Sequence, residues 1–357
     1  MVSLNERVRG AFGSHERVIL IRDRATGLEA IIAIHSTARG PAFCGCRMKP
    51  YPSRGAALRD ALRLSEAMSR KAAMAGLPYG GGKCVVIADP ATQKSDALLR
   101  SLGRAIHQLG GSYLTADDSG TTVRDMEVMR SVTPYARGFA LPSGEACPAS
   151  AYGTFLALRV AVEHRLGRTG LAGVRVAVQG LGNLGLRLCR YLHEAGAELI
   201  VADPQAERVS LAVRDFGAKV VAVDLILSSE ADVLSPNAFG DVICDASVPV
   251  IRAGLIVGGA NNQLRTARHG VALHERGILY IPDYIANVGG VIDIAMEGPG
   301  YAPERVLEAC KGIGHTTALL LQQAERTGLP TSQLADRLAA ERMAPPNEQA
   351  RALEVVA

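Results

Sequence analysis

The pattern of apolar and polar positions along the chain predicts alternating strands and helices. Two runs rich in β-branched residues, at 17–22 and 28–34, flank a polar segment that contains a glycine, which is typical of a β-hairpin. Apolar residues at helical spacing then occur in three places. They predict helices over residues 54–76, 97–109 and 151–166. The first part of the chain is therefore expected to be an α/β domain.

The run Gly-Gly-Gly-Lys at residues 80–83 directly precedes a short apolar run at 84–88 that predicts a buried strand. We interpret the glycine triple as a turn, because glycines add no side chain to packing but let the backbone pass close to a small ligand. An ordinary surface loop is the alternative. A phosphate-binding P-loop is excluded, because it needs Gly five residues before its Gly-Lys and Ser or Thr after it. Leu77 and Cys84 stand at those positions.

Two lysines and an aspartate fall near the ends of predicted elements. Lys71 lies at the end of the first predicted helix, Lys83 ends the glycine triple, and Asp118 follows a predicted strand at 113–116. Ligands of open α/β sheets collect at strand ends, so these side chains are expected to share a site. Two lysines beside one pocket lower each other's pKa, because like charges disfavour the charged form. One of them could then exchange a proton near neutral pH.

The second half of the chain carries a glycine motif in a specific setting. A β-branched strand runs into Gly180-x-Gly182-x-x-Gly185, a helix follows, and the next strand ends at Asp203, about 20 residues on. This arrangement predicts a Rossmann domain, with the pyrophosphate of a dinucleotide at the helix N-terminus. A carboxylate at Asp203 would accept hydrogen bonds from the adenine ribose and repel a 2′-phosphate, which favours NAD over NADP. A doubly wound domain that binds no nucleotide is the alternative.

The α/β alternation continues after this motif with short apolar runs. They begin at Lys219, Val242, Leu255 and Gly277. Two clusters of amides and glycines follow the last two runs, and they include Asn261, Asn262 and Asn287. Amides at the ends of Rossmann strands can bind the nicotinamide, the ribose or the substrate, whereas amide-capped turns are the alternative reading.

Composition and charge exclude several classes of protein. The 357 residues suffice for two domains, and a net charge of +4 with interspersed signs indicates no nucleic-acid partner. No signal peptide or apolar run of membrane-spanning length is present, so no membrane partner is expected. Seven scattered cysteines without a C-x-x-C spacing favour free thiols in the cytoplasm and no metal site.

Taken together, these motifs resemble the glutamate/leucine/phenylalanine/valine dehydrogenases, and within them the leucine dehydrogenase-like branch. The resemblance runs in order over nearly the whole chain. It is carried by residues 31–37, 40–48, 60–64, 68–73, 80–83, 115–118, 179–183, 259–264 and 282–292. It implies an oxidoreductase that deaminates an amino acid with NAD, and a homo-oligomer.

The resemblance also implies an organisation in two domains and a tail. Residues 1–145 would form an α/β domain for substrate binding, catalysis and oligomerisation, and residues 146–330 the doubly wound Rossmann domain for NAD. Residues 331–357 would form a C-terminal helix and tail that pack back on the first domain.

The resemblance assigns roles to individual residues. Lys83 would activate the water that attacks an iminium, Asp118 would shuttle protons to the amine, and Lys71 would hold the α-carboxylate. Hydride would pass from Cα to the nicotinamide in the cleft between the two domains. The further substrate-binding residues implied are Gly45, Met68, Phe43, Ala116, Asn262, Val291 and Ile294. The cofactor-binding residues implied are Gly180, Leu181, Gly182, Asn183, Leu184, Gly185, Asp203, Ser150, Ala238, Asn261 and Asn287.

The residue types fit this chemistry independently, because oxidative deamination needs an anion-binding group, a proton acceptor and a positioned hydride acceptor. The pocket wall implied by the resemblance is apolar, which favours leucine, valine or isoleucine as substrate. Four positions depart from the family's usual pattern and put the substrate in doubt. They are Cys44 in place of a glycine, Phe43 in place of an aliphatic residue, Asn237 in place of a cysteine and Val288 in place of an alanine.

Alternative functions follow from these departures. Phenylalanine, tryptophan or a specialised amino acid is the alternative substrate. A catalytically silent NAD-binding paralogue would be expected to have lost Lys71, Lys83 or Asp118, and all three are retained. An imine reductase acting on a secondary amine is the third possibility.

Overall fold

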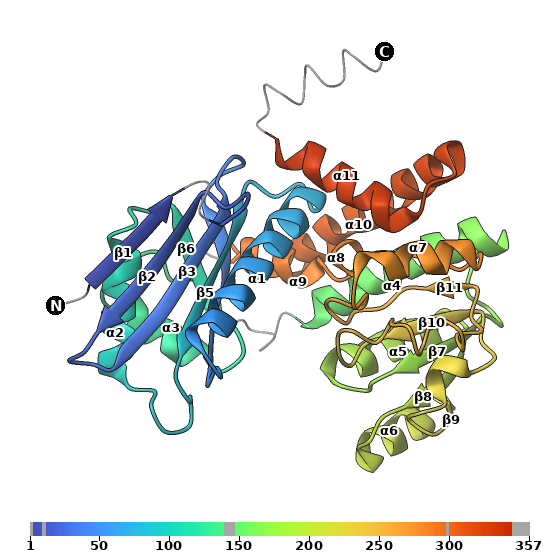
Figure 1. Ribbon diagram of the computed structural model, residues 1–357. Helices are drawn as coiled ribbons and strands as arrows, with labels where there is room; N and C mark the ends of the chain where they lie inside the picture. Colours follow the sequence, from blue (N-terminus) through green and yellow to red (C-terminus); the bar gives the residue numbers. More distant parts are fainter. Residues whose placement is uncertain (1–2, 9–11, 139–146, 298–299, 345–357) are drawn as a thin grey trace. The chain divides into compact units, whose positions relative to one another are not determined.

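The computed structural model describes residues 3–8, 12–138, 147–297 and 300–344 (Figure 1). The chain divides into two compact units, which are described one at a time. The first unit comprises Met1–Gly144, Glu297–Pro299 and Ala339–Ala357, and the second comprises Glu145–Met296 and Gly300–Leu338. The domain boundaries expected from the sequence stay predictions, and the tail expected beyond residue 344 lies outside the described residues.

The first unit is built on one sheet of six strands. The strands are β1 (Ser3–Val8), β2 (Arg17–Asp23), β3 (Leu28–Ser36), β4 (Ala42–Lys49), β5 (Gly80–Ile87) and β6 (Tyr113–Asp117). They lie in the order β1-β2-β3-β5-β4-β6. Strands β2 and β3 form the predicted hairpin, while β4 is parallel to both β5 and β6. The parallel part of the sheet therefore places the ends of β4, β5 and β6 beside one another.

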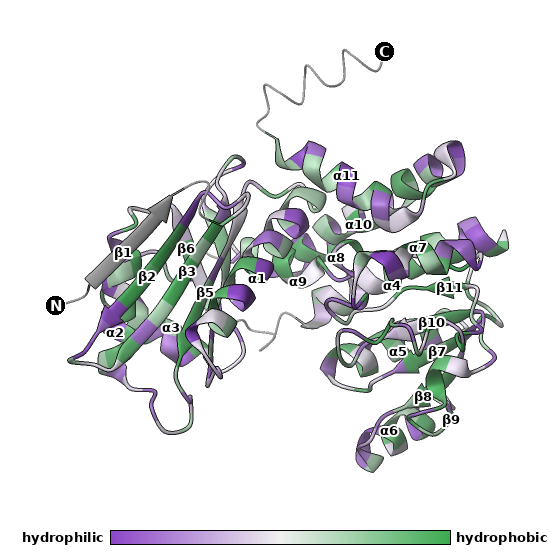
Figure 2. Ribbon diagram, viewed as in Figure 1, coloured by the Kyte–Doolittle hydropathy of each residue, from purple (hydrophilic) through white to green (hydrophobic). Residues whose placement is uncertain are grey.

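Helices cover both faces of this sheet (Figure 1). They are α1 (Arg54–Met74), α2 (Asp96–His107) and α3 (Val123–Arg130). Ala57 and Ala61 of α1 pack on one face with Val85, and Leu102 of α2 packs on the other with Ile32. Figure 2 shows that strands β2 and β3 are rich in hydrophobic residues, and most residues of both strands are buried.

The glycine triple does not form the predicted turn, because it lies inside strand β5. A Cβ on Gly80 would overlap the carbonyl of Ser36, and a Cβ on Gly81 would overlap α1 at Ser69. The glycines are therefore required for the close approach of a neighbouring strand and a helix. Lys83 lies within the strand rather than at its end.

The second unit is a fully parallel sheet of six strands. Its strands are β7 (Arg175–Gln179), β8 (Glu198–Ala202), β9 (Lys219–Val220), β10 (Val233–Pro236), β11 (Leu255–Ile256) and β12 (Leu279–Tyr280). The order β12-β11-β10-β7-β8-β9 is that of a doubly wound nucleotide-binding sheet. The predicted α/β fold class is confirmed.

Helices and one short 3₁₀ turn surround this sheet. They are α4 (Cys147–Leu166), α5 (Asn183–Glu194), α6 (Ala206–Phe216), η1 (Ile226–Ser228), α7 (Ala267–Glu275), α8 (Asp283–Ala286), α9 (Gly289–Ala295), α10 (Pro303–Thr327) and α11 (Thr331–Met343). Helix α7 contributes Leu273 to the core that Leu234 and Ile256 of the sheet form. The last residues of α11 group with the first unit, where Arg342 donates a hydrogen bond to the carbonyl of Met74 at 3.1 Å.

One strand prediction in this unit is wrong, and one strand was not predicted. The run at 242–244 forms only an isolated bridge between Ile243 and Leu264, and the fourth parallel strand is β10, which the sequence pattern did not reveal. Strand β10 reads Val-Leu-Ser-Pro, so only two of its residues carry the apolar signal, although all four are buried. Because β10 is buried on both faces, its polar and apolar residues do not alternate, and the sequence pattern predicts no strand.

A pair of buried histidines packs against helix α1. His35 Nδ1 lies 2.8 Å from Ser69 Oγ, and His15 Nε2 lies 2.9 Å from Ser65 Oγ. The two imidazole rings lie 4.9 Å apart. Burial, and after it the neighbouring His15, lowers the pKa of His35 below its ordinary value of 6.5. The folded state therefore favours the neutral ring.

We expect the free energy of unfolding to fall as the pH drops below about 6.5, because the unfolded chain then binds a proton that folded His35 resists. Denaturant unfolding between about pH 7.5 and about pH 5 measures this slope. The slope should be smaller in His35→Asn than in the wild type. His107→Asn, at an exposed histidine, is the matched control and should keep the wild-type slope. An unchanged slope in His35→Asn would refute the assignment.

Candidate active site

Lys83 and Asp118, the two predicted catalytic residues, form an ion pair in the first unit. Lys83 lies on β5, Asp118 directly follows β6, and β4 runs between those strands. Lys83 is 3% exposed, and its ammonium donates a hydrogen bond to Oδ2 of Asp118. On β4, Gly45 leaves the room this needs, because a Cβ there would lie 2.7 Å from Cβ of Asp118. The structure thus brings three of the predicted site residues together.

A second cation contacts the same carboxylate oxygen of Asp118. Arg47 Nε donates to Oδ2 of Asp118 at 3.3 Å, and Arg47 Nη1 donates to Oδ2 of Asp60 at 3.3 Å. The hydroxyl of Tyr51 donates to the same Asp60 oxygen at 2.6 Å. None of these three residues was predicted as part of the site. Arg47 and Asp60 do lie in stretches that carry the family resemblance, which was the signal available.

The ionisation of the pair follows from these contacts. Burial raises the pKa of Asp118, but the Lys83 ammonium and the Arg47 guanidinium outweigh it and lower that pKa to about 2. Burial lowers the pKa of Lys83, but its interactions with Cys44 and Asp118 outweigh burial, so that pKa lies above its ordinary value. The expectation that a neighbouring lysine depresses the pKa of Lys83 is therefore wrong. The ammonium of Lys83 contacts the carboxylate of Asp118, which favours the protonated lysine.

The other predicted residues of this unit lie on β4, β6 and α1. Ala116 pairs with Gly45 in the sheet and is 1% exposed, and Phe43 is buried with its ring 5.2 Å from that of Tyr79. Lys71 lies in the last turn of α1, and Met68 on the same helix is half-buried. Their roles as wall and carboxylate anchor stay predictions.

The predicted glycine motif of the second unit has the geometry that a dinucleotide needs. Gly180 has a φ of +89° and a Cβ there would lie 2.8 Å from Cβ of Ala238. Gly182 is the N-cap residue of α5, and no side-chain hydrogen bond caps the helix there. A Cβ on Gly185 would overlap the carbonyl of Gly180. Turn, phosphate approach and close helix packing therefore fall on the three predicted glycines.

Asp203 lies beside this motif at the end of β8. Its Oδ2 accepts a hydrogen bond from Leu181 N at 2.7 Å, and its Oδ1 accepts one from Gln205 N at 2.8 Å. Arg208 on α6, which the sequence reasoning missed, places Nη1 4.0 Å from where a Cβ of Gly182 would stand. The glycine motif therefore has a carboxylate and a guanidinium as close neighbours.

The predicted amides gather at the same edge of the sheet. Asn287 Nδ2 donates to Oδ1 of Asn261 at 2.8 Å and to the carbonyl of Gly259 at 3.1 Å. Asn287 Oδ1 is buried and accepts no hydrogen bond from any residue that the structure describes. Asn262 has a φ of +53°, and its N–H donates to Oδ2 of Asp283 at 2.7 Å. A buried acceptor without a donor fits the carboxamide of a nicotinamide.

The remaining predicted residues of this unit frame these amides and the glycine motif. Asn183 and Leu184 begin α5, and the side chain of Leu184 would lie 2.5 Å from a Cβ on Gly259. Ser150 lies on α4, and its N–H would lie 3.0 Å from a Cβ on Gly289. Val291 and Ile294 lie half-buried on α9. Asn237 Oδ1 accepts from Gly259 N at 2.8 Å and so joins the ends of β10 and β11.

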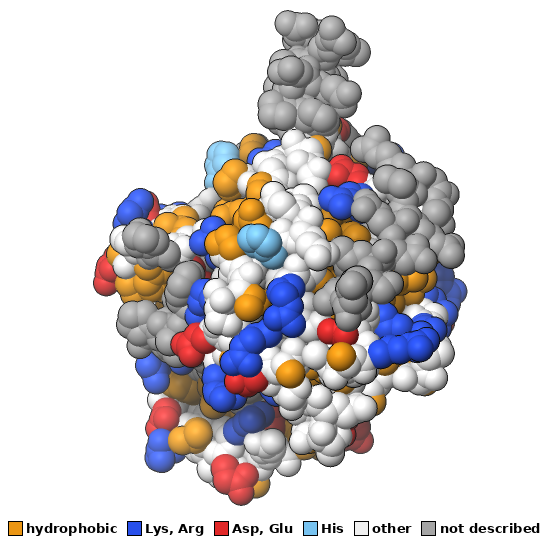
Figure 3. Space-filling model, turned by 90° about the vertical axis from the view of Figure 1, so that its left-hand side faces the viewer, with side chains coloured by type: hydrophobic (Ala, Val, Ile, Leu, Met, Phe, Trp, Pro, Cys, Tyr) orange, Lys and Arg blue, Asp and Glu red, His pale blue; other side chains and the backbone are white. Residues whose placement is uncertain are grey.

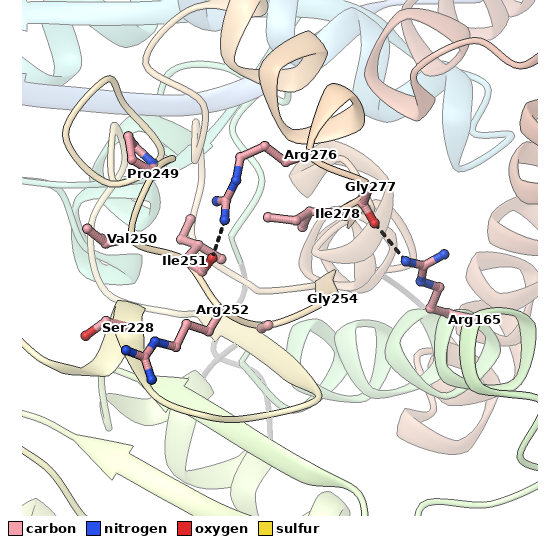
Figure 4. A pocket seen from close by; sticks show the side chains of 11 residues that line it. Arg165, Ser228, Pro249, Val250, Ile251, Arg252, Gly254, Arg276, Gly277 and Ile278 are labelled. Atoms are coloured by element: carbon pink, nitrogen blue, oxygen red, sulfur yellow. Dashed lines mark hydrogen bonds between the residues drawn. The ribbon is translucent and has the colours of Figure 1, made fainter.

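A cavity of about 650 Å³ lies at the opposite, amino-terminal edge of this sheet (Figure 4). Figure 4 shows Arg165 and Arg276 turned toward backbone carbonyls on its lining, those of Gly277 at 2.8 Å and Ile251 at 3.0 Å. None of the predicted site residues lines it. The cavity is therefore separate from the predicted cofactor site.

The surface and the described residues add two observations. On the face that Figure 3 shows, basic and acidic side chains are interspersed rather than gathered into a field of one sign. Within the described residues, no helix has the length and apolarity to cross a membrane, and no three potential ligands cluster as a metal site would require.

Comparison with known proteins decides the family. Residues 15–135 match the family model "Glu/Leu/Phe/Val dehydrogenase, dimerisation domain", and residues 205–301 match "Glutamate/Leucine/Phenylalanine/Valine dehydrogenase". The chain belongs to the Glu/Leu/Phe/Val dehydrogenase family. The predicted family and the prediction of an amino-acid dehydrogenase are confirmed.

Individual relatives of this family align over almost the full length. Leucine dehydrogenase of Bacillus subtilis (strain 168) is 45% identical over 92% of this chain and 91% of its own. Valine dehydrogenase of Streptomyces virginiae is 42% identical over 93% of this chain and 94% of its own. The crystal structure of L-tryptophan dehydrogenase from Nostoc punctiforme superposes with a TM-score of 0.83 at 40% identity, and covers 92% of this chain and 95% of its own.

Gly45→Ala should disturb the Lys83–Asp118 pair, because its Cβ would lie 2.7 Å from Cβ of Asp118. We expect a loss of about 1–3 kcal/mol in the free energy of unfolding, as in other overpacked sites. Gly55→Ala is the matched control, since a Cβ there meets only Arg59 and Ser53 at 3.5 Å or more. Denaturant unfolding compares the two. Equal stability of Gly45→Ala and the wild type would contradict the packing of Asp118 against β4.

Proposed function

We propose that this protein catalyses the NAD-dependent oxidative deamination of an apolar L-amino acid to its 2-oxo acid and ammonia, and the reverse reductive amination. The observation that carries the proposal is the buried Lys83–Asp118 pair in a member of this dehydrogenase family. The second unit supplies a Rossmann sheet with an uncapped helix N-terminus and an orphan amide oxygen at its carboxyl edge. Together these groups provide proton transfer and a place for the hydride acceptor.

The roles of the residues follow from their charge and burial. Lys71 would hold the α-carboxylate of the substrate by its positive charge. As an ammonium, Lys83 would bind the substrate's carbonyl or amine by a hydrogen bond. Once it has released its proton, the neutral amine would activate the water that attacks the iminium by accepting a proton from it. Asp118, ionised at any pH above about 2, would pass protons to and from the amine. NAD, when bound, supplies the hydride acceptor for Cα.

The raised pKa of Lys83 sets the preferred direction with pH. Reductive amination consumes protons, and the protonated side chain of Lys83 can donate one. Oxidative deamination needs the lysine to accept a proton, so it should gain from alkaline pH, where the neutral amine is more populated.

The substrate class follows from the wall residues that the resemblance implies. Phe43, Ala116, Val291 and Ile294 are all apolar, and no cation for a side-chain carboxylate stands among them. We therefore propose leucine, valine or isoleucine as the substrate. Tryptophan or phenylalanine is the second candidate, because a relative named L-tryptophan dehydrogenase is 41% identical over 92% of this chain.

We further propose a homo-oligomer in the cytoplasm, with 1–145 as the catalytic and contact domain and 146–330 as the NAD domain. The match to a family model described as a dimerisation domain falls in the first of these, at 15–135. The six cysteines that the structure describes are free thiols, which suits a reducing compartment.

An amino-acid panel tests the proposed reaction. NADH formation at alkaline pH is expected with aliphatic L-amino acids, and Lys83→Ala should lower kcat by at least about 100-fold while NADH still binds. Turnover only with phenylalanine or tryptophan would keep the mechanism and change the substrate. Reductive coupling of methylamine but not ammonia would instead identify an imine reductase, and binding of NADH without any turnover would identify a silent paralogue.

Cofactor binding tests the role of the glycine motif and its neighbours. Arg208→Ala should weaken binding of NADH about tenfold, because a guanidinium beside Gly182 would bind the pyrophosphate. Arg214→Ala is the matched control on the same helix, since Arg214 pairs with Asp215 instead. Fluorescence titration of NADH and NADPH compares the variants. Equal affinity of Arg208→Ala and the wild type for NADH would contradict the contact, and NADPH tighter than NADH would contradict the preference for NAD.

A further inference from the structure

Lys83 has a second polar neighbour besides Asp118, which the mechanism has not used. Its ammonium donates to Sγ of Cys44 at 3.4 Å, and Cys44 is 8% exposed. The carbonyl of Cys44 accepts a hydrogen bond at 3.0 Å from the hydroxyl of Tyr113, which is itself buried. The hydroxyl of Tyr113 therefore fixes the backbone of Cys44, and the thiol of Cys44 contacts the Lys83 ammonium.

This contact has an electrostatic consequence. An ammonium has three N–H donors, and each hydrogen-bond acceptor that it meets in a buried site stabilises its protonated form. Burial lowers the pKa of Lys83, but its interactions with Cys44 and then Asp118 raise that pKa above its ordinary value. The sulfur of Cys44 is therefore a second acceptor for the ammonium, beside the carboxylate of Asp118.

The contact is particular to Cys44 among the neighbouring cysteines. Cys46, two residues along β4, has its sulfur 3.7 Å from that of Cys84, and both side chains are fully buried in the core of the sheet. A glycine, which the family pattern commonly has where Cys44 stands, could not offer Lys83 a side-chain acceptor. The side chain of Cys44 therefore offers Lys83 an acceptor that a glycine at this position would lack.

We propose that Cys44 is a positioning residue that holds the Lys83 ammonium next to Asp118 by accepting a hydrogen bond from it. The inference rests on the proposed function, because it treats Lys83 as the group that exchanges protons in the reaction. Deamination should rise with pH as Lys83 loses its proton. The proposal predicts that the pH of this rising limb depends on the residue at position 44.

The kinetic test compares pH profiles of kcat/KM for deamination in the wild type, Cys44→Ala and Cys44→Ser. In Cys44→Ala the rising limb should move to lower pH by about half a unit or more, with KM changed less than about twofold. Cys44→Ser keeps a hydrogen-bond acceptor and should fall between the two. Cys46→Ala is the matched control, since it removes a buried thiol on the same strand and should leave the limb in place.

A second measurement needs no turnover and separates this inference from the proposed function. Competitive acetylation with acetic anhydride, read at Lys83 by mass spectrometry, follows the fraction of neutral amine with pH. Lys83 should be labelled at lower pH in Cys44→Ala than in the wild type or Cys46→Ala. If no amino acid is turned over but this shift is seen, the proposed function fails and the role of Cys44 stands.

The contrary result is equally defined. A Cys44→Ala protein with wild-type thermal stability, an unmoved kinetic limb and an unmoved labelling profile would show that Cys44 only fills space. If Cys44→Ala unfolds too readily to measure, Cys44→Ser and the family-like Cys44→Gly carry the same comparison. Wild-type profiles in both of those variants would overturn the proposal.

Discussion

The organisation of the first unit depends on one buried ion pair, that of Lys83 with Asp118. A charged lysine that is 3% exposed is tolerable only where anions compensate its lost hydration. Three neighbouring parallel strands bring the compensating carboxylate to the lysine. Lys83 lies on β5 and Asp118 follows β6, while β4 runs between them and carries Cys44 and Gly45. Removing either partner would leave a buried charge uncompensated, at a cost of about 3–5 kcal/mol when the pair is fully buried. Since the side chain of Asp118 is 26% exposed, the cost here should be smaller.

The second unit meets a different constraint, which is the approach of a ligand to backbone at the carboxyl edge of a parallel sheet. Glycines at 180, 182 and 185 keep that edge open, and its amides are fixed by each other and by backbone groups. Its large cavity lies at the amino-terminal edge instead, where arginines bind backbone carbonyls. The cofactor site predicted from residue chemistry and strand direction therefore lies away from this cavity.

Much of this could be predicted from the sequence, and the failures have physical reasons. The hairpin, helices α1 and α2 of the first unit and the glycine motif were visible because their signals are local in the chain, whereas helix α3 was not predicted. The glycine triple was mistaken for a turn, because close packing against α1 and β3 is a tertiary requirement that glycine meets equally well. Strand β10 was missed because burial on both faces removes the alternation. The pKa of Lys83 was predicted in the wrong direction, since its partners Asp118 and Cys44 lie far from it in sequence and meet only in the sheet.

The most direct test of the central claim measures the pKa of Lys83 itself. In protein labelled with [15N]lysine, the Lys83 signal can be assigned by its absence from Lys83→Met and followed with pH in the wild type and in Asp118→Asn. If the carboxylate holds the lysine as an ammonium, the pKa in Asp118→Asn must be lower than in the wild type. An unchanged or higher pKa in that variant would contradict the buried ion pair as the basis of the site.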